Sequence, residues 1–404
     1  MNTPFGHLTY CTNIHPGESW ADHFTALRQH VPEIKKRISP DKPFGIGLRL
    51  SDLASRDLIK NENLEPFIQW LKTENCYVFT MNGFPYGGFH RRKVKDHVHT
   101  PDWTTYNRVE YTIRLFDILS ALLPEGMEGG ISTSPLSYRL WHAEDKKSSV
   151  FDITTKHILH VVEHLMNIRK KTGQTMHLDI EPEPSGLIEN GPEFIAWYTD
   201  MLLPEGVKYL KARTGLDADK SAHAIKEHIR LCYDVCHFAV GFENHQEIVN
   251  QLREVGIKTG KIQISAALKA PIAKQPADRD SVSSAFRKFN ESTYLHQVIA
   301  RQEDGRLLRY PDLPEALLDA GNESVREWRS HFHVPLFVKE YDVLQSTQSD
   351  IEDVLAIHKK QPFTSHLEIE TYTWEVLPEA LRLPMTDSIV RELEWVVRCL
   401  QKHA

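Results

Sequence analysis

The sequence has few of the features that mark secreted or membrane proteins. Its five cysteines among 404 residues are too few, and odd in number, for a disulfide framework, so we expect reduced thiols. No stretch approaches 18 consecutive apolar residues, which argues against membrane insertion. The first residues lack the basic and apolar segments of a signal peptide. We therefore expect a cytoplasmic protein.

An excess of positive charge is absent as well. The formal net charge is −7 at pH 7, and the Lys and Arg residues are scattered along the chain. This pattern argues against a nucleic-acid partner, which would need a basic surface. The most basic segment, residues 90–95, is interpreted as a solvated loop, with contact to a substrate phosphate as the alternative.

Several common catalytic motifs are missing. No Gly-x-Gly-x-x-Gly follows the first predicted strand, which argues against a dinucleotide-binding open sheet. Neither Gly-x-Ser-x-Gly nor a Walker-type Gly-x-x-x-x-Gly-Lys-Ser/Thr occurs, so serine hydrolases and nucleotide phosphoryl transfer receive little support. The spacing of Cys232, Cys236 and His237 matches no common zinc site.

The sequence does contain a regular alternation of short β-rich runs, loops with Pro, Gly or Asn, and longer segments of helical periodicity. Apolar residues recur on one face of a predicted helix at Trp20, Phe24, Leu27, Val31 and Ile34. The alternation predicts eight strands, at residues 7–13, 44–49, 76–81, 129–133, 176–181, 229–234, 261–265 and 365–370.

Strands that alternate with helices form a parallel sheet, because parallel neighbours need crossover connections. An open doubly wound sheet satisfies the same pattern, but the count of eight favours an α/β fold closed into a (β/α)8 TIM barrel over residues 1–404. Residues 266–341 form a long insertion between the seventh and eighth strands. We expect helices at 281–290 and 314–320 within this insertion, which would lie near the active face.

Carboxylates and histidines gather at the strand ends that meet at the mouth of such a barrel. The fifth and eighth predicted strands share the string His-Leu-acid-Ile-Glu, at 177–181 and 366–370. Period-two alternation places the three polar residues of each string on one strand face. Ionisable residues inside a closed barrel cost free energy unless they pair with one another or bind a cation. A buried ion-pair network and a metal site are therefore the two interpretations.

The acids that end the fifth, sixth and eighth strands favour a metal site. Glu181, Asp234 and Glu370, with a neutral imidazole nearby, would form an oxygen-rich shell for a divalent ion such as Mn, Mg, Co or Zn. Such an ion polarises a carbonyl, and two carboxylates on opposite sides can remove and return a proton. We predict these proton transfers for Glu181 and Glu370, with His237 orienting a substrate hydroxyl or the metal shell.

This chemistry predicts a metal-dependent isomerase or epimerase that acts on a small polyhydroxylated substrate, such as a sugar, sugar phosphate or cyclitol. A dehydratase using the same ion and a non-catalytic, metabolite-binding or scaffold barrel are the alternatives. The sequence leaves open whether the chain forms a homo-oligomer. Candidate substrate contacts, each with a structural interpretation as well, are His15, Trp20, Asn82, Phe84 and Arg139.

Three short motifs carry a resemblance to a known superfamily. Glu181 followed by Pro, the Asp-x-x-His of residues 234–237, and Glu370 resemble the xylose-isomerase-like barrels, which include sugar isomerases, ketose epimerases, inosose dehydratases and endonuclease IV. The resemblance implies the same barrel and a metal held by Glu, Asp, His and Glu from the fifth to the eighth strand. Gln263 stands where that His would be, and an amide binds zinc less well than imidazole.

Two histidines near the end of the insertion are candidates for the missing imidazole. Either His331 or His333 would reach the metal, the alternative being that both serve the packing of the insertion itself.

Longer segments resemble a narrower family. Residues 8–20, 82–87 and 330–336 resemble the EboE proteins of bacterial ebo gene clusters, and this resemblance runs over nearly the whole chain. It implies participation in the production or movement of a small metabolite, without fixing a reaction.

Overall fold

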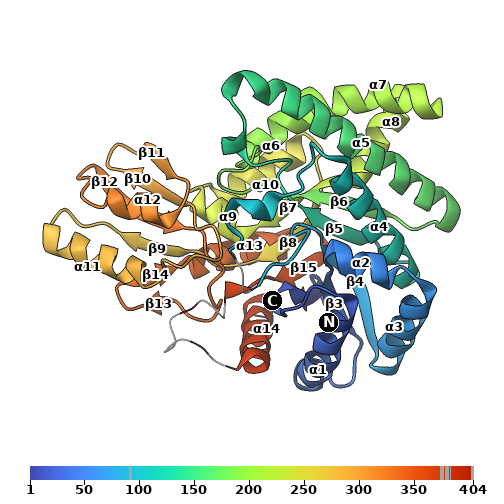
Figure 1. The fold of residues 1–404 in the computed structure, drawn as a ribbon, viewed down its shortest axis with the longest axis horizontal. Coiled ribbons are helices and arrows are strands. Elements are labelled where there is room, and N and C mark those ends of the chain that lie inside the picture. The colour runs from blue at the N-terminus through green and yellow to red at the C-terminus, as the bar shows by residue number, and fades with distance from the viewer. Residues whose placement is uncertain (91–92, 374–376, 378–381, 383, 402–404) are drawn as a thin grey trace.

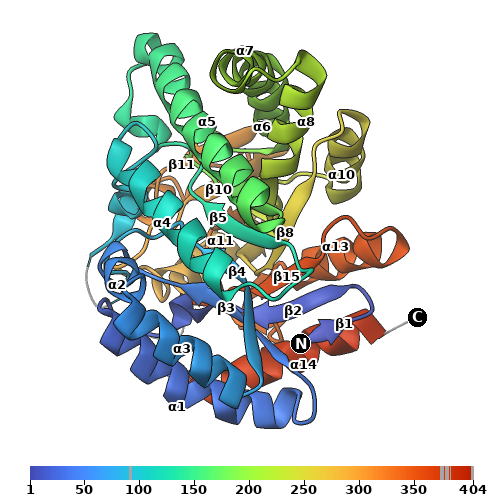
Figure 2. The ribbon, with the colours of Figure 1, turned by 90° about the vertical axis from the view of Figure 1, so that its right-hand side faces the viewer.

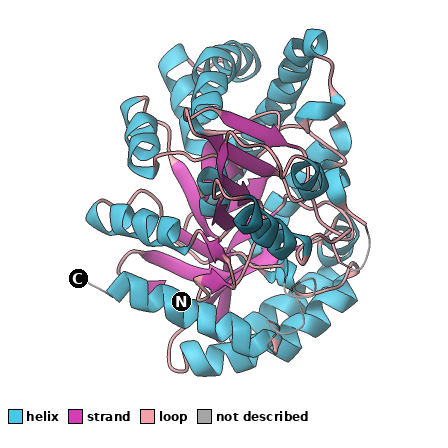
Figure 3. Cartoon of the chain, turned by 90° about the vertical axis from the view of Figure 1, so that its left-hand side faces the viewer, coloured by secondary structure: helices cyan, strands magenta, loops and turns pink. Residues whose placement is uncertain are grey.

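The computed structural model describes residues 1–90, 93–373, 377, 382 and 384–401. Eight parallel strands form its centre and follow one another around the sheet in chain order. Figure 3 shows these strands inside a surrounding layer of helices. The strands are β2 (Gly6–Tyr10), β3 (Phe44–Arg49), β4 (Cys76–Asn82), β5 (Gly129–Thr133), β6 (Met176–Ile180), β7 (Ile229–Asp234), β8 (Thr259–Ile264) and β15 (His366–Ile369).

The sheet closes on itself between β2 and β3. Cys11 and Gly47 form a parallel bridge, and the Thr9 hydroxyl donates to the Gly45 carbonyl at 2.8 Å while accepting from the Gly47 amide at 3.0 Å. A short strand β1 (Asn2–Thr3) pairs with β2 in the antiparallel direction. Because β15 also pairs with β2, all eight parallel strands have neighbours on both sides, and the predicted α/β TIM barrel is confirmed.

Helices pack around the outside of the barrel (Figures 1 and 2). The first, α1, starts at a capping box in which Ser19 and Asp22 satisfy each other's backbone amides, and its apolar face is buried as the periodicity predicts. The principal outer helices are α1 (Trp20–Ile38), α2 (Asp52–Leu58), α3 (Asn61–Thr73), α4 (Tyr106–Leu122), α5 (Lys147–Thr172), α6 (Gly191–Trp197), α7 (Leu203–Thr214), α8 (Ala218–His228), α9 (Val235–Val240), α10 (His245–Glu254), α13 (Gln348–Lys360) and α14 (Met385–Gln401).

The chain between β8 and β15 builds a second, antiparallel sheet beside the barrel (Figure 1). Two helices accompany it, α11 (Pro276–Arg287) and α12 (Leu313–Leu318), which overlap the helices expected there. The sheet itself was not predicted. Its strands are β9 (Leu268–Pro271), β10 (Val298–Gln302), β11 (Leu307–Tyr310), β12 (Val325–Ser330), β13 (Glu340–Tyr341) and β14 (Leu344–Ser346).

A buried carboxyl on α14 joins the loop between β12 and β13 to the loop after β15. Glu392 accepts hydrogen bonds from the Leu336 amide at 3.1 Å and the Thr371 hydroxyl at 2.8 Å, and burial raises its pKa to about 8. The folded protein therefore keeps this proton over a pH range in which the unfolded chain has lost it.

We expect Glu392→Gln to reduce the loss of stability between pH 6 and pH 8.5. A raised carboxyl pKa makes the native state bind more protons, so its stability falls by up to about 1.4 kcal/mol per pH unit between the unfolded and folded pKa values. Glutamine has no proton to lose. Thermal melts at both pH values measure the difference, and Glu394→Gln, at an exposed position on the same helix, should leave the wild-type pH dependence unchanged.

Candidate metal centre

The barrel interior is polar along much of its length. The two His-Leu-acid-Ile-Glu strings supply His177 and His366 near the amino-terminal end of the strands, then Asp179 and Glu368, all of them buried. Lys261 on β8 lies between the acids and donates to Glu368 at 2.5 Å. Branched apolar residues usually fill such barrels, so the buried ionisable residues of this interior are unusual.

Glycines on other barrel strands, each two places away around the sheet, make room for these polar side chains. A Cβ atom at Gly260 would overlap the Asp179 carboxylate, and one at Gly47 would overlap the Glu368 carboxylate. We infer that the absence of side chains at these positions allows the buried acids to fit within the barrel.

Three carboxylates meet at the carboxyl-terminal mouth. Glu181 directly follows β6, Asp234 ends β7, and Glu370 directly follows β15. One oxygen from each lies within 4.8 Å of the other two, and all three residues are buried. The structure thus brings together the acids on which the sequence-based metal site rests.

The carboxylates differ in how they are held. Glu370 Oε1 accepts hydrogen bonds from the side-chain amides of Asn13 at 2.6 Å and Asn82 at 2.8 Å. Asp234 Oδ1 accepts from the Ser265 hydroxyl at 2.6 Å, and it also caps α9. Glu181 Oε2 and Asp234 Oδ2, in contrast, are buried and accept no hydrogen bond from the described part of the chain. These oxygens have the character expected of ligands that await a cation.

The pKa shifts of the three acids at the mouth also favour a bound cation. Burial and repulsion from Glu370 and Asp234 raise the pKa of Glu181 well above its usual value. Burial and repulsion from Asp234 and Glu368 likewise raise the pKa of Glu370. Burial also raises the pKa of Asp234, although the neighbouring His237 opposes this shift. Like charges at this distance need protons or a cation between them, so the residues fit a divalent metal.

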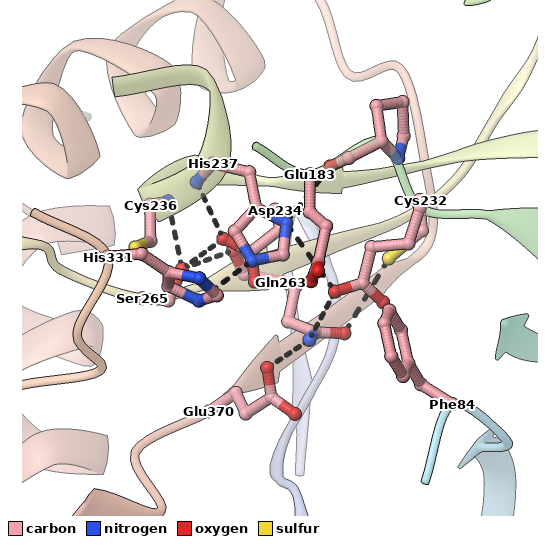
Figure 4. A network of polar contacts seen from close by, with 12 residues as sticks. Phe84, Glu183, Cys232, Asp234, Cys236, His237, Gln263, Ser265, His331 and Glu370 are labelled. Atoms are coloured by element: carbon pink, nitrogen blue, oxygen red, sulfur yellow. Dashed lines mark hydrogen bonds and ion pairs between the residues drawn. The ribbon is translucent and has the colours of Figure 1, made fainter. Parts of the chain in front are cut away.

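Gln263 bridges two of the acids. Its Nε2 donates to Glu181 at 3.3 Å and to Glu370, and its Oε1 accepts from the Cys232 thiol at 3.6 Å (Figure 4). The amide is therefore a donor in this arrangement, and it would have to turn over to offer its oxygen to a metal ion.

Three histidines border the carboxylates. His333, from the segment after β12, has Nδ1 at 3.3 Å from Glu370 Oε2 and Nε2 at 3.9 Å from Asp234 Oδ2. His237 Nε2 faces His331 Nε2 at 3.2 Å (Figure 4). Burial lowers the pKa of His331 to about 3 and that of His333 well below its usual value, so both imidazoles are neutral. Nitrogens of His237 and His333 and an oxygen of Asp234 lie within 4.8 Å of one another.

A fourth carboxylate at the mouth was missed at the sequence level. Glu183 pairs with the buried His99 at 3.0 Å. Although burial alone would raise its pKa, His99, His237 and His331 lower the pKa of Glu183 to about 2. The Glu-Pro-Glu-Pro string at 181–184 was the available signal, but nothing in the sequence indicated that His99 would lie beside it.

A cavity of about 50 Å³ is lined by Glu181, Glu183 and Glu370 and by His237, His331 and His333. That volume holds roughly three to five water molecules, which suits an ion with part of its hydration shell. The predicted contacts Asn82 and Phe84 both lie in its wall. The wall also contains aromatic and polar residues that the sequence did not indicate, namely Asn13, Phe89, Tyr294, Gln297 and Tyr372.

Three predicted substrate contacts lie outside the lining of this cavity. His15 Nε2 is hydrogen-bonded to the Tyr10 hydroxyl at 2.9 Å, and its ring stacks on that of His30. His15 does not line the cavity. Trp20 is buried against Phe67 between α1 and α3, because its helical periodicity faces the core. Arg139 pairs with Glu193 in a separate surface depression.

Part of the basic segment also reaches the cavity. Lys95 lines it but is paired with Asp312 at 2.5 Å, which neutralises its charge. Arg91 and Arg92 lie outside the described residues.

Comparisons with known proteins bear on the fold. No family model and no curated protein matches the chain, so they give the EboE resemblance no support. Among solved structures, the chain is similar to an L-ribulose 3-epimerase, with 11% identity, 98% of this chain and 94% of the other covered, and a TM-score of 0.49.

Two further structures show the same likeness. One is a xylose isomerase-like TIM barrel protein from Mycobacterium smegmatis in complex with magnesium (11% identity, 97% and 98% covered, TM-score 0.47). The other is an IOLI protein with a bound zinc atom (13% identity, 98% and 99% covered, TM-score 0.45). Likenesses at this level concern the barrel alone and assign no activity to this chain.

The sequence analysis argued against membrane insertion, and the helices of the structure bear on that expectation. None of the helices within the described ranges is both long and apolar enough to cross a bilayer.

Proposed function

We propose that this barrel is a metal-dependent isomerase or epimerase that acts on a small polyhydroxylated metabolite. The observation that carries the proposal is the meeting of Glu181, Asp234 and Glu370, whose oxygens lie within 4.8 Å of one another, with Glu181 and Glu370 in the wall of the cavity at the mouth. Two of these acids keep an oxygen without a hydrogen-bond partner among the described residues. The EboE resemblance adds a metabolite of an ebo-type biosynthetic or transport pathway as the proposed source of the substrate.

The three carboxylates would hold the cation, with His333 as the adjacent imidazole. Gln263, His331 and His237 would complete or support this shell. A divalent ion bound there supplies Lewis acidity, which lowers the cost of removing a proton next to a substrate carbonyl.

Glu181 is the better placed base of the two predicted carboxylates. Its Oε2 is uncommitted and its pKa is raised, which is the state that a general base or acid needs near neutral pH. His237 Nδ1 lies 3.7 Å from Glu181 Oε1 and donates to the Pro182 carbonyl at 3.0 Å, so it orients this side of the site. Glu370, fixed by two asparagine amides, would hold the opposite side.

The cavity wall suits the carbon face of a sugar or cyclitol. Phe84, Phe89 and Tyr372 present rings against which apolar C–H groups pack. Because the cavity is small, a substrate larger than a few atoms enters only if wall side chains move, and water is excluded once it has entered.

A non-catalytic metabolite-binding or scaffold barrel is the second candidate. The observation that favours it is Gln263, whose amide already bridges Glu181 and Glu370 and thereby offsets part of their repulsion without a metal. A dehydratase would use the same acids, and loss of water from a cyclitol would distinguish it.

Proton exchange with solvent tests the proposal. Protein loaded with Mn²⁺, Mg²⁺, Co²⁺ or Zn²⁺ is incubated in D₂O with a panel of aldoses, ketoses, their phosphates and cyclitols, and deuterium at carbon is measured by mass spectrometry. We expect metal-dependent incorporation into at least one compound, lost in Glu181→Gln and kept in Glu205→Gln, an exposed residue of α7. Tight binding of a compound without incorporation under any of the four metals would instead establish the non-catalytic barrel.

A further inference from the structure

A second cluster of ligand-type side chains lies at the opposite, amino-terminal end of the barrel. Nitrogens of His177 on β6 and His366 on β15 and a carboxylate oxygen of Glu128, which precedes β5, lie within 4.8 Å of one another. Both histidines are buried, and Glu128 is partly exposed. The two histidines are the first residues of the two His-Leu-acid-Ile-Glu strings, and neither belongs to the centre at the mouth. Four residues of strand separate His177 from Glu181, or about 13 Å.

Each histidine has one nitrogen engaged and one free of hydrogen bonds. His177 Nδ1 is bonded to Asp179 Oδ1 at 2.6 Å, and His366 Nε2 to the Glu128 carbonyl at 3.2 Å. The other two nitrogens, Nε2 of His177 and Nδ1 of His366, are buried and have no hydrogen-bond partner among the residues described. A bond to an acceptor fixes the proton on the engaged nitrogen, so the remaining nitrogen carries a lone pair.

This arrangement is the one that metal-binding histidines show. A ligating imidazole commonly donates its other N–H to a carboxylate or a backbone carbonyl, which sets its tautomer and orientation. Here His177 has the carboxylate and His366 has the carbonyl. Burial lowers the pKa of both imidazoles well below the usual value, so both are neutral and able to coordinate.

Space and access are provided at the same end. A Cβ atom at Gly130 would overlap the His177 ring, so the ring occupies room that only glycine leaves. Glu128 lies in the walls of two surface depressions of about 730 and 430 Å³, through which an ion would reach it from solvent.

Positive charge is the main opposing factor. Arg230 donates to Glu128 Oε2 at 3.1 Å, and the Ser365 hydroxyl donates to Oε1 at 2.9 Å. A carboxylate has about four lone-pair sites, so both oxygens keep capacity for a cation. On the other side, His177 is bonded to the Asp179 carboxyl, whose pKa is raised by burial, while Lys261 and Arg230 oppose this shift.

We propose that Glu128, His177 and His366 form a second metal site, selective for imidazole-binding divalent ions such as Zn²⁺ or Co²⁺, that fastens β5, β6 and β15 at the base of the barrel. Two imidazoles and one carboxylate suit these ions and disfavour Mg²⁺, which prefers oxygen ligands. The site is separate from the mouth and does not depend on the proposed activity.

The test removes the mouth site first, so that the two sites are measured apart. In the background Glu181→Gln/Glu370→Gln, zinc titration by calorimetry is expected to show one remaining site per chain, and Zn²⁺ is expected to raise the melting temperature while Mg²⁺ does not. Adding Glu128→Gln, or separately His366→Gln, should weaken this zinc binding at least about 10-fold. The melting temperature without zinc checks that each variant folds.

X-ray absorption of the zinc-loaded background supplies a readout that does not need a ligand variant. We expect the scattering pattern of two imidazoles around the ion. Absence of zinc binding in the background would overturn the proposal. Binding of equal affinity after Glu128→Gln and His366→Gln would overturn it as well, because the zinc would then lie at another group such as Glu183, His237 and His331.

Discussion

Glu181→Gln and Glu370→Gln are each expected to weaken Mn²⁺ or Zn²⁺ binding at the mouth by at least about 100-fold. Changing a residue that only supports a metal ligand typically costs 10–100-fold in affinity, and these two carboxylates would be ligands themselves. Calorimetric titration of metal-free protein measures the effect. Glu243→Gln replaces a partly buried carboxyl away from the centre, bonded to the Gly191 amide, and should leave the affinity unchanged.

Although Glu181→Gln should weaken metal binding, it should stabilise the metal-free protein. Because the pKa of Glu181 is raised in the folded protein, its ionisation disfavours the native state increasingly as the pH rises. Glu181→Gln is therefore expected to raise the melting temperature of the metal-free protein, and more at pH 8 than at pH 6. A metal-free variant that is less stable than the wild type at pH 8 would show that Glu181 serves the fold rather than a cation.

Lys261→Met is expected to lower the free energy of unfolding by about 3–5 kcal/mol. Lys261 and Glu368 are fully buried and paired at 2.5 Å in the middle of the barrel. Removing one partner leaves an uncompensated charge in a medium that solvates it poorly, and such losses fall in this range. Denaturant unfolding followed by circular dichroism measures the difference.

A double variant distinguishes the loss of one partner from the loss of the whole ion pair. Replacing both members of a buried ion pair by apolar residues is often neutral or stabilising, so Lys261→Met/Glu368→Leu should recover most of the lost stability. A cost below about 1 kcal/mol for Lys261→Met alone would mean that water or another group solvates Glu368.

The barrel strands were predictable because each is a short β-rich run bounded by turn residues. The segment 129–133, for example, is a strand with the bounds expected. The second sheet was not predictable in the same way. Its strand β12 reads Val-Arg-Glu-Trp-Arg-Ser, and its charged residues pair across the sheet, Glu327 with Arg301 and Arg326 with Glu303. Such pairs form only after distant strands have met.

The site was predictable to the extent that it follows from barrel closure. Acids at the ends of β6, β7 and β15 must share a mouth once the sheet closes, so Glu181, Asp234 and Glu370 could be grouped from the sequence alone. The position of His333 depends on how a long segment folds back over the mouth, and that of His99 on a loop after β4. Sequence spacing carries no information on either.

The most direct test is an anomalous-scattering map from crystals grown with Zn²⁺ or Co²⁺, recorded at the absorption edge of the ion. We expect a peak bonded to carboxylate oxygens of Glu181, Asp234 and Glu370 at about 2.0–2.2 Å. A map without a peak among these three residues, with their carboxylates still held by Gln263 and the asparagines, would contradict the metal centre on which the proposed function depends.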